Sequence, residues 1–186
     1  MGNYGLSLSM IQCVSLLHYL GDDTRDFDNN VFLPLLSSLD SATLEKIHFS
    51  IVPFPLPYHI TAHKVVQGLL YVQDQKGDQA ALESLRYFLN NINLWDEQTV
   101  KTLTINQYMA NLAENLSNKY GFDKATIFAQ LMHYSEYDKN TRVVAKYAMG
   151  ALRIPGTPSA YINGVAVDGG TQMNKDQWIT LIKSLL

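Results

Sequence analysis

The sequence predicts an α/β fold in which a small sheet is split by a long helical segment, and three observations support this. Two short apolar runs, Ile11 to Leu17 and Ile47 to Val52, flank a stretch with helical spacing, which is typical of a parallel β-α-β unit. From His59 to Leu152 apolar residues recur at helical spacing almost throughout. A proline then leads into an apolar run that turns at Asn163-Gly164, and a final amphipathic helix follows.

The amino-terminal elements follow from apolar runs and polar punctuation. Ile11 to Leu17 is short and apolar enough for a strand buried on both faces. Residues 21–26 are polar and acidic and predict a loop, after which Asp28 offers a helix cap. Pro34 lies inside the helical pattern and predicts a kink. Three prolines soon after Ile47 to Val52 close the second strand.

The helical segment carries recognisable start and stop signals. Asp78 predicts the cap of one helix. Thr104 with Gln107 forms a capping-box pattern, and Gly121 is a plausible stop for the same helix. Asp123 then opens another helix. The segment therefore divides into several amphipathic helices.

The carboxyl-terminal part reads as a hairpin followed by a helix. Pro158 cannot donate a ladder hydrogen bond, so it needs an edge position or a special turn, often with a cis bond. Asn163-Gly164 between two apolar runs is the strongest short-range hairpin signal, and the last helix begins near Asn174. The order β-α-β, helices, β-β-α predicts one domain with two lobes: 1–57 and 153–186 form one, and 58–152 is inserted.

Composition excludes several function classes. The chain of 186 residues has 47% hydrophobic and 17% charged residues and a formal charge of −3, which gives no support to nucleic-acid or anionic-membrane binding. No apolar run is long enough to span a bilayer. The apolar stretch Leu6 to Leu20 has no preceding Lys or Arg, so we expect a strand there and not a signal peptide.

Two sequence blocks resemble the DsbA-like branch of the thioredoxin superfamily. The residues that carry the resemblance are Phe54-Pro55-Leu56-Pro57-Tyr58-His59 with Ala62, and then Thr141-Arg142, Lys146-Tyr147, Gly156-Thr157-Pro158 and Ile162-Asn163-Gly164. The resemblance covers roughly Ile11 to Leu186. It implies a thioredoxin-like fold with a DsbA-type helical insertion between the second strand and a cis-proline strand that begins at Thr157-Pro158.

The chain is most similar to a eukaryotic branch that lacks the Cys-x-x-Cys motif. Matching its acidic-Thr-Arg-Asp pattern to residues 22–26 places the two lost cysteines at Gly21 and Thr24. Counting back from the proline of the first helix places them at Asp26 and Asn29 instead. Neither register contains cysteine, and both stay open at this point.

The chain contains one cysteine, Cys13, in the first predicted strand. We interpret it as a small buried hydrophobic residue, because nothing nearby supplies the exposure and positive charge of a reactive thiol. Disulfide exchange needs a thiolate that attacks and a second thiol that resolves the intermediate. The sequence therefore excludes conventional oxidoreductase chemistry through a cysteine pair of its own, and it predicts no catalytic residue.

The leading hypothesis is a redox-inactive module that binds an extended peptide or a protein partner, without a cofactor. Relatives hold extended substrate beside the cis-proline by strand addition. The predicted groove consists of Gly21, Asp22, Asp23, Thr24 and Arg25 facing Thr157 and Pro158. The sequence fixes neither the oligomeric state nor the compartment; the cytoplasm is slightly favoured, and the resemblance also allows the secretory pathway.

Two other functions stay open. Kappa-class glutathione transferases, which are DsbA-related, hold a glutathione thiolate with a serine near the position of Thr24, but the surrounding aspartates would repel a thiolate. The second open function is a purely structural module in which the groove is vestigial. His59 and His63 are four residues apart, yet no Glu stands beside the first, so we expect no metal site.

Overall fold

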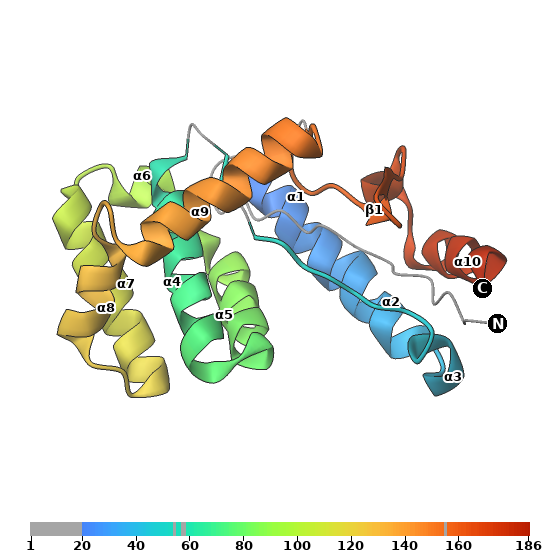
Figure 1. Cartoon of the computed structure of the whole chain (residues 1–186), viewed down its shortest axis with the longest axis horizontal. Helices are drawn as coiled ribbons and strands as arrows, with labels where there is room; N and C mark the ends of the chain where they lie inside the picture. Colours follow the sequence, from blue (N-terminus) through green and yellow to red (C-terminus); the bar gives the residue numbers. More distant parts are fainter. Residues whose placement is uncertain (1–19, 54, 57–58, 155) are drawn as a thin grey trace.

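The computed structural model describes residues 20–53, 55–56, 59–154 and 156–186. A helical bundle and a smaller lobe with a β-hairpin are bridged by the long helix α9 (Figure 1). The predicted strand Ile11 to Leu17, with Cys13, lies outside the described residues. The predicted division at residues 57 and 152 stays a prediction.

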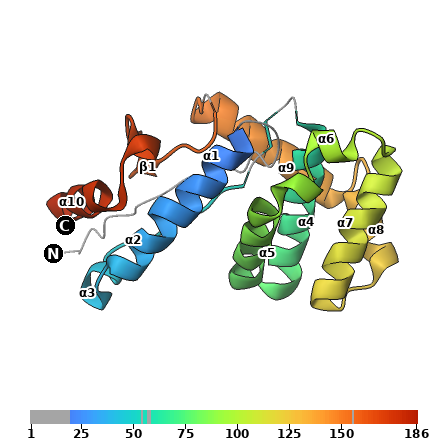
Figure 2. The same ribbon diagram turned by 180° about the vertical axis from the view of Figure 1, so that it is seen from behind.

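One helical rod opens the described chain, where α1 (Leu20–Phe27), η1 (Asp28–Phe32) and α2 (Leu33–Ser38) run on without a break (Figure 2). Pro34 lies at the start of α2. It has no N–H to donate, and the preceding turn is a π-turn in which the Leu33 N–H bonds the Asp28 carbonyl. The rod thus accommodates its proline by widening one turn.

Two predictions for this region were wrong. Residues 21–26 form helix and not a loop: they lie within α1, and polar residues occupy the exposed face of a helix as readily as a loop. Asp28 is no cap: its carboxylate is 2% exposed and accepts from Arg86 Nε on α5 at 3.3 Å. The Asp28 carboxylate therefore pairs with Arg86 on α5, and no local sequence pattern reveals that partner.

After the short helix α3 (Ser41–Leu44), residues 47–52 carry no helix or strand assignment within the described part of the chain. A strand needs a partner, and the predicted partner lies outside that part. The side chains still alternate: Ile47, Phe49 and Ile51 pack against the core, and the Phe49 ring meets that of Phe32 edge-on at 5.8 Å. This two-residue period is that of extended backbone, although no strand is assigned there.

The helical bundle has one apolar core, formed by buried faces of its four longest helices. Its elements are α4 (Ile60–Lys76), α5 (Asp78–Asn90), η2 (Ile92–Leu94), α6 (Glu97–Val100), α7 (Ile105–Tyr120) and α8 (Lys124–Leu131). Leu112, Leu116 and Phe88 are fully buried there. Burial of such side chains, at about 1.5–3 kcal/mol each, stabilises this lobe independently of the hairpin.

Most of the predicted helix ends in the bundle are confirmed. The Thr104–Gln107 capping box starts α7, and Gly121 ends it in the left-handed region at φ 71°. Asp123 caps α8 by accepting from the Thr126 N–H at 2.7 Å. Asp78 is the first residue of α5 and not its cap. Gly77, with φ 85°, takes the cap position because the tight α4–α5 connection needs a residue without Cβ.

The carboxyl-terminal elements are α9 (Glu136–Lys146), η3 (Tyr147–Ala151), β1 (Tyr161–Ile162), β2 (Val165–Ala166), η4 (Gly170–Gln172) and α10 (Lys175–Leu185). The hairpin is confirmed: β1 and β2 pair antiparallel, and Asn163 and Gly164 both have positive φ, as a two-residue I′ turn requires. The Thr157–Pro158 bond is cis, as the resemblance implied.

Trp178 fixes α10 against the turn that follows the hairpin. It is fully buried, and its Nε1–H donates to the Gly170 carbonyl at 2.9 Å. A Cβ on Gly170 would lie 3.1 Å from both Trp178 Cζ2 and Val167 Cβ, so a larger residue there would require these neighbours to shift by a few tenths of an ångström. The indole therefore supports the segment that follows β2.

We expect Trp178→Phe to lower the free energy of unfolding by about 1–3 kcal/mol, because the indole bond to the Gly170 carbonyl and part of the buried ring are lost, while the Met173 N–H at 3.3 Å remains as a donor. Leu185→Ala on the same helix, where the side chain is 42% exposed, should cost clearly less. Urea unfolding of both variants measures the difference. Equal costs would mean that the indole bond contributes nothing.

Candidate functional site

A cavity of about 720 Å³ lies where the first helical rod faces the cis-proline segment. Asp23, Asp26, Phe27 and Val31 line one side. Residues 156–161 and 166–172 line the other. We call this cavity the groove. Two segments far apart in the sequence therefore meet at one site, with the hairpin beside the helical rod (Figure 1).

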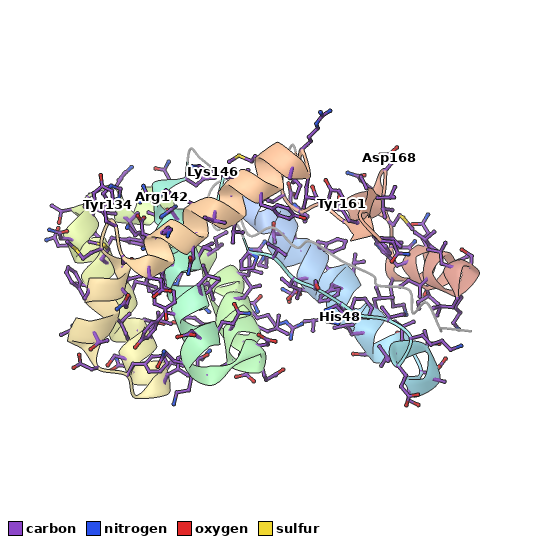
Figure 3. All side chains as sticks on the ribbon, viewed as in Figure 1. His48, Tyr134, Arg142, Lys146, Tyr161 and Asp168 are labelled. Carbon is purple, nitrogen blue, oxygen red and sulfur yellow. The ribbon has the colours of Figure 1, made fainter. Side chains whose placement is uncertain are left out.

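The groove has an acidic lining. Asp23, Asp26 and Asp168 contribute carboxylates, and no Lys or Arg occurs among its described lining residues. Asp168 stands at the outer face of the hairpin lobe (Figure 3). Arg25 partly offsets Asp26, since its Nε and Nη2 each lie 3.1 Å from Asp26 Oδ1. Within the described structure no Lys or Arg forms an ion pair with Asp23 or Asp168, so the groove favours neutral or positive groups.

The backbone of the cis-proline segment offers hydrogen-bonding groups. Ala160 accepts from the Val167 N–H at 2.9 Å, which continues the hairpin pairing by one step. Within the described residues no backbone hydrogen bond is recorded for Thr157 or Ser159. The buried Thr157 Oγ1 also has no partner there, although the residue is only 4% exposed. Buried polar groups are nearly always paired, so these groups suit an added partner.

The predicted site residues are partly brought together. Asp23, Thr157 and Pro158 line the groove. Thr24 is fully buried, and Arg25 is turned to Asp26. Gly21 and Asp22 lie in α1, and the Asp22 side chain is outside the described structure. The prediction missed Asp168 and the rest of 166–172. The sequence pointed to them only through the hairpin turn at Asn163-Gly164, which brings the returning chain back to the groove.

The two registers of the lost cysteine pair have different surroundings. In the second register Asp26 lines the groove, whereas Asn29 donates from Nδ2 to Asn90 Oδ1 on α5 at 2.9 Å. In the first register Thr24 is buried. Among the described side chains at the positions of the two registers, Asp26 lines the groove, and Thr24 and Asn29 are not among its lining residues.

The two histidines that were weighed as metal ligands have other neighbours. His63 Nε2 lies 2.8 Å from Asp138 Oδ1, and His59 is buried beside the start of α4. Among the described residues, no group of three or more His, Cys, Asp or Glu side chains is placed to hold a metal ion.

Solved structures similar to this chain are disulfide-exchange proteins. A proposed protein-disulfide isomerase from Pseudomonas syringae superposes with a TM-score of 0.71 at 16% identity, covering 97% of this chain and 95% of that one. A variant of DsbA from Pseudomonas aeruginosa gives 0.61 at 16% identity, covering 100% and 88%. The oxidoreductase DsbA from Xylella fastidiosa gives 0.60 at 18% identity, covering 99% and 88%.

No protein-family model matches the sequence, and no curated protein matches it. The structural likeness defines the fold: this chain is a thioredoxin-fold protein of the DsbA-like kind with a helical insertion. It carries that fold with a single cysteine and hence without a Cys-x-x-Cys pair. In the part of the chain that the structure describes, no helix is both long and apolar enough to cross a membrane.

We expect the protein to leave the rate of insulin reduction by dithiothreitol unchanged, because one cysteine cannot attack and resolve a disulfide within the same chain. Turbidity of the precipitating insulin chains measures the rate, with a DsbA as the positive control. Acceleration that disappears in Cys13→Ser would contradict this expectation.

Proposed function

We propose that this protein is a redox-inactive binding module that holds an extended segment of a protein partner in the groove. The observation that carries the proposal is the groove itself, about 720 Å³ in volume and bordered by the cis-proline segment. Cavities of this size accommodate several side chains of a bound segment. Its position matches the place where a thioredoxin fold meets its substrate.

Backbone pairing supplies the first part of the binding. An extended segment can add to a free strand edge, where main-chain bonds give affinity and neighbouring pockets select alternate side chains. The backbone groups of Thr157 and Ser159 and the Thr157 hydroxyl are available to it within the described structure. Phe27, Val31 and Val167 supply apolar lining for one of its side chains.

Charge supplies the selectivity. A lysine of the partner about 4 Å from one carboxylate gains about 1 kcal/mol in bulk water and more in a sheltered site. Asp23 and Asp168 lie on opposite walls of the groove, so a basic segment meets attraction on both sides. An acidic segment meets repulsion from both.

The transferase alternative fits the geometry less well. Thr24, the residue that would hold a glutathione thiolate, is fully buried and not part of the described groove lining. A thiolate in the groove would lie among carboxylates and without a described lining cation. The structural-module alternative is separated from the proposal only by a binding experiment.

We expect a basic extended peptide to bind more tightly than an acidic one. Two fluorescent peptides of about eight residues, identical except for two lysines in one and two glutamates in the other, serve as probes. Anisotropy at low salt should give the lysine peptide an affinity about three- to tenfold higher. The difference should shrink in high salt, since exposed charges are screened.

The double variant Asp23→Asn with Asp168→Asn should remove most of the preference. Asp26 is left in place because Arg25 already pairs with it. The control carries Glu45→Gln with Asp176→Asn, two exposed positions outside the groove with the same change in charge. If neither peptide binds, or if both double variants lose the preference equally, the groove does not bind and the structural-module hypothesis is favoured.

Glutathione should bind no more tightly than about 1 mM, because its thiolate and carboxylates meet like charges in the groove. Calorimetric titration measures the affinity, and conjugation of a chlorodinitrobenzene substrate should stay at the uncatalysed rate. Micromolar affinity that Thr24→Ala weakens would favour the transferase over the binding module.

A further inference from the structure

A second cavity, of about 310 Å³, lies between the amino-terminal part of α4, residues 55–56, the α8–α9 turn and α9. We call it the junction cavity. It shares no described lining residue with the groove. Its lining is rich in basic side chains, whereas the lining of the groove is acidic.

A buried carboxylate lies at the polar end of the junction cavity. Asp138 is 2% exposed, and both of its oxygens are occupied. Oδ1 lies 2.8 Å from His63 Nε2; Oδ2 accepts from the Tyr134 N–H at 3.0 Å and from Arg142 Nη2, with His133 Nδ1 at 3.4 Å. Burial raises the pKa of Asp138, but these bonds and the Arg142 charge outweigh it and hold the pKa below its usual value.

Donors outnumber acceptors around this carboxylate. The cavity lining contains Lys64, Arg142, His59, His63 and His133 and, among the described residues, no acid besides Asp138. Lys64 donates inward to Gln67 Oε1 and the Leu131 carbonyl. Arg142 presents five N–H donors, of which one, on Nη2, is donated to Asp138 within the described residues, and its side chain is 41% exposed. An anion that enters the cavity can therefore accept from the remaining N–H groups of Arg142. The nearby Asp138 carboxylate is already bonded by His63, Tyr134 and Arg142.

The remaining lining of the junction cavity is apolar. Pro55, Leu56, Ala145 and Met149 form that part, and Leu56 is 3% exposed. A bare inorganic anion would leave these surfaces without a partner. A cavity with one cationic end and one apolar wall matches a small molecule that has a single carboxylate and a compact apolar body.

Two irregularities of the backbone border the cavity. Tyr134, beside the lining residue His133, has φ 66° and an 83% exposed ring, which is rare for a bulky residue. The Arg142 guanidinium lies 5.7 Å from the centre of that ring, and both residues lie toward the bundle end of α9 (Figure 3). Met149 lies in the π-turn η3. Such irregularities persist where the surroundings hold them, and they cluster at ligand sites.

We propose that the junction cavity binds a small organic monocarboxylate, with its carboxylate on Arg142 and its apolar body against Leu56, Ala145 and Met149. This site is independent of the groove and of any segment bound there. The exposed Tyr134 ring lies 5.7 Å from the guanidinium and adds a cation–π contact to it.

Benzoate is the probe for this site, and two analogues separate its features. Benzamide keeps the ring without the charge, and inorganic phosphate keeps the charge without the ring. The readout is the methyl resonance of Met149 in protein labelled at methionine methyl groups. Benzoate should shift it saturably below about 10 mM, and neither analogue should do so at that concentration.

Variants on α9 test the assignment. Arg142→Gln should weaken benzoate binding by at least about tenfold, the loss expected for one charged hydrogen bond. Lys146→Gln removes the same charge from an exposed position on the same helix and should change the affinity by less than about twofold (Figure 3). Ala145→Leu leaves all charges in place and fills the apolar part, so it should abolish binding even if Arg142→Gln unfolds the protein.

Each other outcome overturns the proposal. Absence of saturation means that the cavity takes no carboxylate. Phosphate binding as tightly as benzoate means an anion site without apolar recognition. A benzoate shift that survives Ala145→Leu places the ligand elsewhere on the protein.

Discussion

The buried carboxylate of Asp138 is the interaction on which the arrangement of the two lobes depends. It accepts from the Tyr134 N–H and Arg142 and contacts His63, so it joins α9 and the turn before it to α4. The Arg142 side chain is 41% exposed, so solvent partly screens this ion pair, and removing Arg142 would leave the buried carboxylate less well compensated. From this joint α9 runs toward the hairpin lobe (Figure 1).

Much of the fold could be predicted because its signals are local. The capping box at Thr104 needs only a side chain and an amide three residues on, and the Asn163-Gly164 turn needs only two residues that accept positive φ. The start of the first helix could not be read in the same way. Asp28 looks like a cap in sequence, but it is paired with Arg86, fifty-eight positions away. A long-range ion pair leaves no trace in local spacing.

The candidate site divides along the same line. Thr157, Pro158 and Asp23 were found through the resemblance to DsbA-like proteins, which rests on Gly156-Thr157-Pro158 and on the acidic-Thr-Arg-Asp pattern of residues 22–26. Asp168 was missed since only the return of the hairpin brings it to the groove. The junction cavity was missed for a related reason. Sequence spacing relates His63 to His59, four residues earlier, whereas the structure pairs His63 with Asp138 from α9.

The acidic lining of the groove has a consequence for thiol acidity. A nucleophilic cysteine needs a low pKa, which relatives of this fold obtain from the positive end of a helix and from nearby positive charge. Asp23 and Asp168 act in the opposite direction on any thiol placed between them. Engineering a cysteine pair back into α1 would therefore yield a sluggish, mostly protonated thiol. Exchange chemistry in this groove would therefore require replacement of the carboxylates as well as a cysteine pair.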